Sequence, residues 1–152
     1  MQTNVSPVLF LCSGNYYRSR FAEHLFNHLA AKASLPYRAD SAGLVPNCQT
    51  RNHGPISAEA VSALQARGVS LPDVHRLPRD VSEDAIRAAA IVVGLNETEH
   101  RPLVLERFPG LCDRIEYWHV DDVEYAPPSK ALPLIESNVR ALIARLQRRH
   151  CA

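Results

Sequence analysis

The sequence lacks the features that mark membrane, secreted and nucleic-acid-binding proteins. Its formal net charge is only +1, so there is no general electrostatic attraction to nucleic acid. Its first apolar run ends at Cys12, which is too short for a membrane-spanning helix or for the apolar core of a secretory signal. We find no internal repeat, low-complexity segment or linker. We therefore expect a cytoplasmic protein that binds neither membranes nor nucleic acid.

Cysteine is too sparse and too scattered to suggest a metal site. The four cysteines are Cys12, Cys48, Cys112 and Cys151. They form no C-x-x-C pair, so zinc ligation is not indicated, and in a reducing compartment they should be free thiols. His24 and His28 lie four residues apart on an expected helix, but no third ligand accompanies them. We expect both histidines to be solvated, and we expect no metal and no cofactor.

Short apolar runs alternate with helical patterns along the 152 residues. This alternation is typical of βαβ units that build a parallel sheet, and the length fits one domain over residues 1–152. Strands are expected at residues 8–11, 37–42, 90–95 and 115–120. Helices are expected at 19–33, at 57–68, in a short segment from 82, at 97–107 with an interruption at Pro102, and at 132–148. Loops are expected at 43–55 and 125–129.

The most informative segment reads VLFLCSGNYYRS and begins at Val8. In it, Cys12 and Arg18 flank a five-residue loop that follows the first strand and precedes a helix. Backbone N–H groups of a tight loop and the positive end of a helix stabilise a bound anion, and they stabilise a thiolate for the same reason. The planar fork of Arg18 can hold two phosphoryl oxygens. The segment therefore predicts a phosphate pocket that contains a nucleophile.

These residues resemble the C-x5-R-[ST] signature of the low-molecular-weight protein tyrosine phosphatases. The resemblance extends along nearly the whole chain: 40–43 (DSAG) is similar to the family's second-strand segment, His75-Arg76 to its H-[RK] element, and 118–122 (WHVDD) to the segment with its general acid. It implies a single-domain three-layer αβα fold with a four-stranded parallel sheet, the flavodoxin-like phosphotyrosine phosphatase I fold.

The resemblance also implies hydrolysis of a phosphomonoester through a cysteinyl-phosphate intermediate, without a metal. Cys12 would be the nucleophile, Arg18 the phosphate clamp and Asp122 the general acid and base. Asp121 is the rival acid, because the two carboxylates are adjacent and Val123 stands where the family usually has a proline. The phosphate-binding residues would be Ser13, Gly14, Asn15, Tyr16, Tyr17 and Arg18.

Three further residues match supporting positions of the family. Ser19, Ser41 and His75 would form, with Asn15, a hydrogen-bond network that braces the phosphate loop. Tyr17 stands where many relatives have a second cysteine, so the protective disulfide should be absent. Tyr16 could stack on an aryl substrate, narrow the entrance or simply pack, and the polar stretch 96–102 could contribute to the rim or simply be solvated.

Two other functions compete with the phosphatase. A thioredoxin-coupled arsenate reductase shares the loop but needs a cysteine pair after the third strand, where 94–97 reads GLNE. A catalytically silent phosphate- or phosphopeptide-binding module would use the same pocket without turnover. For a phosphatase, a phosphotyrosine protein, a small aryl phosphate and phosphoarginine all fit the loop, and the oligomeric state is not predicted.

Overall fold

The computed structural model describes residues 4–71 and 75–150. Within these residues, four parallel strands pair in the order β2-β1-β3-β4. They are β1 (Ser6–Cys12), β2 (Tyr37–Gly43), β3 (Ile91–Gly94) and β4 (Ile115–Tyr117). The predicted four-stranded parallel sheet is therefore confirmed, with the first strand at its centre.

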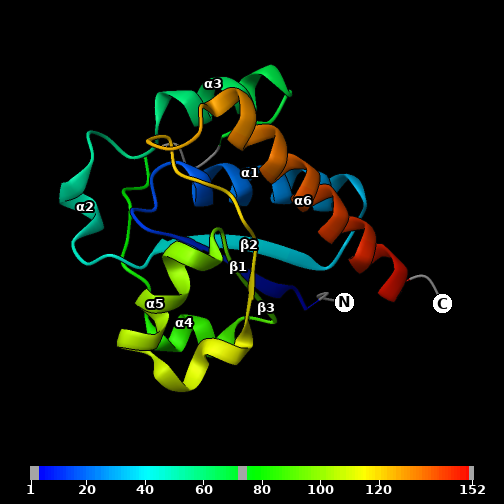
Figure 1. The fold of residues 1–152 in the computed structure, drawn as a ribbon. Coiled ribbons are helices and arrows are strands. Elements are labelled where there is room, and N and C mark those ends of the chain that lie inside the picture. The colour runs from blue at the N-terminus through cyan, green and yellow to red at the C-terminus, as the bar shows by residue number, and fades with distance from the viewer. Residues whose placement is uncertain (1–3, 72–74, 151–152) are drawn as a thin grey trace.

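Helices cover both faces of this sheet, so the molecule has three layers (Figure 1). One face carries α1 (Arg18–Lys32), α3 (Ala58–Ala66) and α6 (Pro128–His150). The other face carries α4 (Glu83–Ala88), α5 (Glu97–Arg107) and the 3₁₀ helix η1 (Pro109–Arg114). The arrangement confirms the predicted αβα fold. No helix in the described part of the chain has the length and apolar character needed to span a bilayer.

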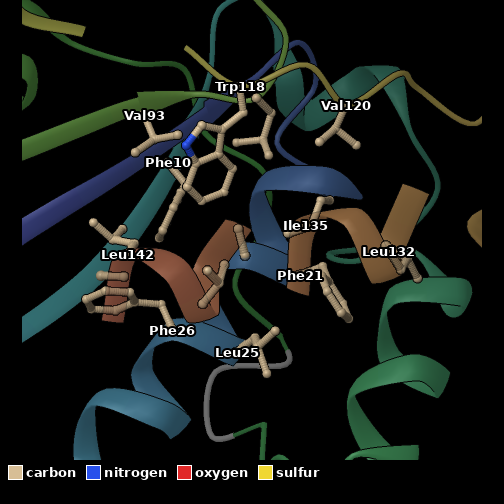
Figure 2. Close-up of a cluster of buried hydrophobic side chains, with 14 of the residues drawn as sticks. Phe10, Phe21, Leu25, Phe26, Val93, Trp118, Val120, Leu132, Ile135 and Leu142 are labelled. Carbon is tan, nitrogen blue, oxygen red and sulfur yellow. The ribbon is translucent and has the colours of Figure 1, made fainter. Parts of the chain in front are cut away.

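The alternation of side chains along β1 builds both halves of the core. Val8 and Phe10 pack with α1 and α6, whereas Leu9 and Leu11 point to the opposite layer. The Phe10 ring lies 5.7 Å from the ring of Trp118 and contacts the helical side at the same time (Figure 2). Because residues on both faces of β1 are buried, the strand is a continuous apolar run.

Three expectations about element boundaries are wrong. A short helix, α2 (Cys48–Arg51), interrupts the predicted loop 43–55, because the Asp80 carboxylate accepts the N–H groups of Asn47 and Cys48 from across the chain. Helix α6 begins at Pro128, inside the predicted loop 125–129, since proline suits the first helical position. Strand β4 ends at Tyr117 instead of residue 120.

Two expectations about helices also change. Helix α5 continues past Pro102 without a break in its bounds. His24, expected on the surface, is buried in α1, and its Nε2 lies 3.1 Å from Nη2 of Arg20. The spacing of residues along the helix does not reveal this burial, because which part of the chain covers a given helix face depends on the tertiary structure.

The strand order places the site at one edge of the sheet. From β1 the chain crosses to β2 on one side and later to β3 on the other. In open α/β sheets, ligands bind beyond the carboxyl ends of the strands at such a switch of direction. The loop that follows Cys12 leaves the sheet at this point.

Candidate active site

The predicted phosphate loop is a tight turn between two rigid elements. Cys12 is the last residue of β1 and Arg18 is the first of α1. The C=O of Ser13 accepts a hydrogen bond from the N–H of Val45 at 3.0 Å, which ties the loop to the segment after β2. A Cβ on Gly43 would lie 2.8 Å from the same carbonyl oxygen, so the absence of a side chain allows this close approach.

Asn15 organises the interior of the loop. It is fully buried and has φ of 52°, a left-handed conformation that asparagine tolerates. Its Nδ2 donates to Ser41 Oγ at 2.8 Å and to Ser19 Oγ at 2.9 Å. Ser19 Oγ also accepts a hydrogen bond from the Cys12 thiol, whose Sγ is 3.0 Å away. The structure thus brings Asn15, Ser19 and Ser41 together, as predicted.

His75 does not take part in this network, and its predicted supporting role is corrected. Its side chain is exposed. The neighbouring Arg76 enters instead, and donates to Asn15 Oδ1 at 3.1 Å and to Ser41 Oγ and Glu23 Oε1 at 3.0 Å each. The Ser41 hydroxyl and the Glu23 carboxylate both accept hydrogen bonds from Arg76. A guanidinium can donate to two such acceptors at once, which an imidazole does less well.

Arg18 lies beneath the loop with its side chain only 1% exposed. Its Nη1 donates to Glu99 Oε2 at 2.9 Å and its Nη2 to Glu99 Oε1 at 2.8 Å, in a bidentate pair. Nη1 also donates to the carbonyl of Val120 at 2.9 Å. The bidentate pair with Glu99 uses the Nη1–Nη2 edge of the guanidinium, so the Nε–Nη2 edge faces away from Glu99.

The sequence does not distinguish Glu99 and His100 individually, although both belong to the polar stretch 96–102. They lie in the first turn of α5, directly after the carboxyl end of β3. Asn96 caps this helix, since its Oδ1 accepts the N–H of Glu99 at 3.1 Å. An asparagine followed three residues later by a glutamate is a helix-start pattern. That pattern, at the end of a central strand, is the signal that could have located them.

His100 connects this helix to Ser13. Its Nδ1 accepts the N–H of Asn96 at 3.0 Å, so we assign the ring proton to Nε2, which faces Ser13 Oγ at 3.2 Å. Burial lowers the pKa of His100, which favours this neutral form. The Ser13 hydroxyl donates in turn to Glu99. Since Nε2 already carries a proton, His100 cannot accept the proton of the Ser13 hydroxyl and so cannot activate it as a nucleophile.

A pocket opens above the loop, and it contains one of the two adjacent acids. Asp122 lines it together with Cys12, and Asp122 Oδ2 lies 3.4 Å from Nη2 of Arg18. Asp121 points elsewhere, and its carboxylate accepts the Asn96 amide at 3.0 Å. Arg18 also lines the pocket, and the remaining lining residues are Gly14, Tyr16, Tyr17, Asn52, Ser57, Glu59, Val123 and Glu124.

The two tyrosines of the loop occupy different surroundings. Tyr16 Oη donates to the carbonyl of His53 at 2.6 Å, which fixes its ring as part of the pocket wall. Tyr17 is buried against the core, and its hydroxyl has no hydrogen-bond partner among the described residues. Burial and the nearby carboxylates of Asp122 and Glu59 raise the pKa of Tyr17 to about 12, so it stays protonated.

The described residues offer no metal site. Within 4–71 and 75–150, no three His, Cys, Asp or Glu side chains gather where they could hold an ion. Cys48 and Cys112 are buried free thiols, whereas Cys151 lies outside the described residues. The charged and nucleophilic groups that line the pocket are the Cys12 thiol, the Arg18 guanidinium and the carboxylates of Asp122, Glu59 and Glu124.

Comparisons with known proteins agree with this geometry. A family model described as low molecular weight phosphotyrosine protein phosphatase matches residues 7–151. The protein-arginine-phosphatase of Bacillus subtilis (strain 168) is 25% identical over 108 residues, which are 71% of this chain and 67% of the relative. The crystal structure of YfkJ from Bacillus subtilis has a TM-score of 0.82 at 24% identity, over 98% of this chain and 99% of that one.

A second solved structure extends the likeness. The low molecular weight protein tyrosine phosphatase from T. tengcongensis has a TM-score of 0.74 at 25% identity, and the match covers 95% of this chain and 99% of that one. The family match spans both the phosphate loop and the segment that carries Asp122. The chain therefore belongs to the low molecular weight phosphotyrosine protein phosphatase family, and it is a phosphatase.

Proposed function

We propose that this phosphatase hydrolyses phosphorylated protein side chains through a cysteinyl-phosphate at Cys12. One observation carries the proposal: Cys12, Arg18 and Asp122 line the same pocket, with Ser19 Oγ 3.0 Å from the nucleophilic sulfur. A nucleophile, an oxyanion clamp and a proton donor that share one pocket are the parts that such a displacement needs.

In the first step, the Cys12 thiolate attacks phosphorus in line with the leaving group. The P–O bond to the leaving group breaks as the S–P bond forms, and Asp122 gives its proton to the departing oxygen. The Nε–Nη2 edge of Arg18 and the N–H groups of the loop hold the three equatorial oxygens, where negative charge accumulates.

In the second step, water attacks the cysteinyl-phosphate. Asp122, now a carboxylate, takes a proton from that water, the S–P bond breaks, and inorganic phosphate leaves. Ser19 Oγ lies 3.0 Å from Cys12 Sγ, so once the sulfur is a thiolate the Ser19 hydroxyl can donate to it and stabilise it as it departs. Every proton is accounted for by the chain and the water, so the scheme uses no metal and no cofactor.

The leading substrates are phosphotyrosine proteins and small aryl phosphates, in line with the family. Phosphoarginine is a second candidate, because three carboxylates line the pocket, those of Glu59, Asp122 and Glu124. An acidic rim attracts a cationic guanidinium more than a neutral aryl ring. The Bacillus subtilis relative named protein-arginine-phosphatase supports the same candidate.

The phosphatase relatives weigh against the two competing functions, the arsenate reductase and the silent binding module. We also place the protein in the cytoplasm as one domain. The free thiols Cys12, Cys48 and Cys112 suit a reducing compartment, which supports that location.

The test is steady-state hydrolysis of p-nitrophenyl phosphate in the presence of EDTA. Cys12→Ser should abolish turnover, because the nucleophile is lost. Asp122→Asn should lower kcat by roughly 10²- to 10⁴-fold, the usual contribution of a general acid. Asp121→Asn is the matched control and should stay close to wild type, since that carboxylate faces Asn96.

Absence of turnover in folded, reduced wild-type protein would contradict the proposal. So would full activity of Cys12→Ser. Comparing kcat/KM on peptides that carry phosphotyrosine or phosphoarginine then decides the substrate class. If the acidic rim selects the substrate, Glu59→Gln should lower the preference for phosphoarginine.

A further inference from the structure

Arg18 lies between two carboxylates that come from different parts of the chain. Glu99, at the start of α5, binds it with two hydrogen bonds of 2.8 and 2.9 Å. Asp122, after β4, approaches Nη2 no closer than 3.4 Å. Two parallel N–H···O bonds make the stronger pair, so the structure favours Glu99 as the partner of Arg18.

We propose that Glu99 is a positioning residue for Arg18. It holds the guanidinium by its Nη1–Nη2 edge, so that the Nε–Nη2 edge faces the phosphoryl group and Asp122 stays free to donate its proton. The inference rests on the proposed function, because it assigns to Glu99 a part in that reaction without contact with the substrate.

The geometry of the Arg18–Glu99 pair explains how the Glu99 carboxylate can set the orientation of the Arg18 guanidinium. A guanidinium is planar, and a bidentate carboxylate lies in the same plane, so the two bonds fix both its tilt and its rotation. The carbonyl of Val120 accepts a third bond from Nη1 and closes that side. The remaining donors of Arg18 are therefore directed away from Glu99.

Glu99 is itself held rigidly, which positioning requires. Its backbone N–H is bound by the Asn96 cap, and its carboxylate accepts the hydroxyl of Ser13. Burial alone would raise the pKa of Glu99, but hydrogen bonds from His100, Arg18 and Ser13 outweigh it and keep that pKa well below the usual range. Glu99 is therefore ionised at neutral pH, and its carboxylate can pair with Arg18.

Removal of this charge would free Arg18 to move. Its nearest other carboxylate is Asp122, already 3.4 Å from Nη2. A direct pair between them would turn the clamp away from the phosphoryl group and hold the general acid out of reach of the leaving oxygen. We therefore expect losses in both phosphate binding and turnover.

The experiment is a double-mutant cycle on kcat/KM for p-nitrophenyl phosphate, with Glu99→Gln, Arg18→Lys and the double variant. Glu99→Gln should lower kcat/KM by about 10- to 100-fold, the usual cost of misplacing a catalytic group. In the Arg18→Lys background, the same change should cost less than about threefold, because lysine has no bidentate edge to position. The cycle is repeated on the affinity for inorganic phosphate.

Glu97→Gln is the matched control, since Glu97 lies in the same helical turn but pairs with Arg101 on the surface. Its kcat/KM should stay near wild type. Glu99→Asp keeps the charge but is one methylene shorter, so it should retain more activity than Glu99→Gln. This second variant, with thermal unfolding of all proteins, separates a positioning effect from a loss of folding.

Two results would overturn the inference. One is a Glu99→Gln enzyme with unchanged or higher kcat/KM. The other is an equal loss in the wild-type and Arg18→Lys backgrounds, which would mean that Glu99 acts on stability and not through the guanidinium. If the wild type itself shows no turnover, the proposed function fails, and the phosphate-binding cycle alone still tests the pairing.

Discussion

Single buried polar residues hold the phosphate loop in its conformation. Asn15 donates its amide N–H groups to the hydroxyls of Ser19 and Ser41, and so holds Ser19 Oγ 3.0 Å from Cys12 Sγ. Arg76 donates to the amide oxygen of Asn15, and both Arg76 and Ser41 donate to the carboxylate of Glu23. A buried network of this kind is stable when every member finds a partner.

The first prediction concerns the two adjacent residues His75 and Arg76. Arg76→Gln should lower the free energy of unfolding by roughly 1.5 to 3 kcal/mol, because it removes hydrogen bonds to a charged and buried partner. It should also lower kcat, since Asn15 and Ser41 lose a donor. His75→Gln should change neither quantity, as the side chain is exposed. Urea unfolding and hydrolysis of p-nitrophenyl phosphate measure both.

The reverse pattern, with His75→Gln inactive and Arg76→Gln normal, would restore the expectation drawn from the sequence. It would mean that the network observed around Arg76 is not the one that supports catalysis. Arg76→Lys provides a further check, because it keeps the charge and should recover part of the stability.

At the scale of elements, the site depends on how closely three segments approach one another. The phosphate loop after β1 packs on the end of β2 and on α2, and Gly43 lies at the point of contact. Helix α5 then brings its first turn against the other side of the loop. Loops between parallel strands can meet this closely because their strand ends lie on the same edge of the sheet.

The second prediction concerns this contact. Gly43→Ala should destabilise the protein by about 1 to 3 kcal/mol and lower activity, because its Cβ would lie 2.2 Å from Cys48 Sγ and 2.8 Å from the Ser13 carbonyl oxygen. Gly110→Ala is the control, since nothing lies within 4 Å of a Cβ at that position. Urea unfolding compares the two; equal stability of both variants would contradict the packing argument.

At the scale of the whole molecule, the buried residue His100 links the pH dependence of folding stability to the candidate active site. His100 joins α5 to the phosphate loop and is fully buried, with its pKa lowered chiefly by burial and also by Arg18, against an opposing effect of Glu99. The unfolded chain binds a proton on this residue below about pH 6.5. The folded protein binds that proton less readily, so stability is lost as the pH falls below that value.

The third prediction follows from this linkage. The wild type should lose more unfolding free energy between pH 7 and pH 5 than His100→Gln, which has no imidazole to protonate. His119→Gln is the control, because that side chain is 74% exposed, and it should keep the wild-type dependence. Urea unfolding at both pH values measures the free energy of unfolding. An equal change in that free energy between pH 7 and pH 5 for wild type and His100→Gln would refute the prediction.

Much of this architecture follows from contiguous stretches of sequence. The strand, loop and helix around Cys12 and Arg18 lie within one continuous stretch, residues 6–32, and their periodicity and spacing depend on local backbone geometry. The alternation of apolar runs likewise predicts the parallel sheet. The place of Ser41 beside Asn15 was expected from family resemblance and is confirmed by the structure.

Tertiary structure alone decided the contacts between distant segments. Glu99 pairs with Arg18 across 81 positions of the chain, and Arg76, not His75, reaches Asn15 from 61 positions away. Asp122 turns into the pocket while Asp121 turns out, although the two are adjacent and chemically identical. Local propensity cannot make these choices, because each depends on which partner the packed sheet and helices bring within hydrogen-bonding distance.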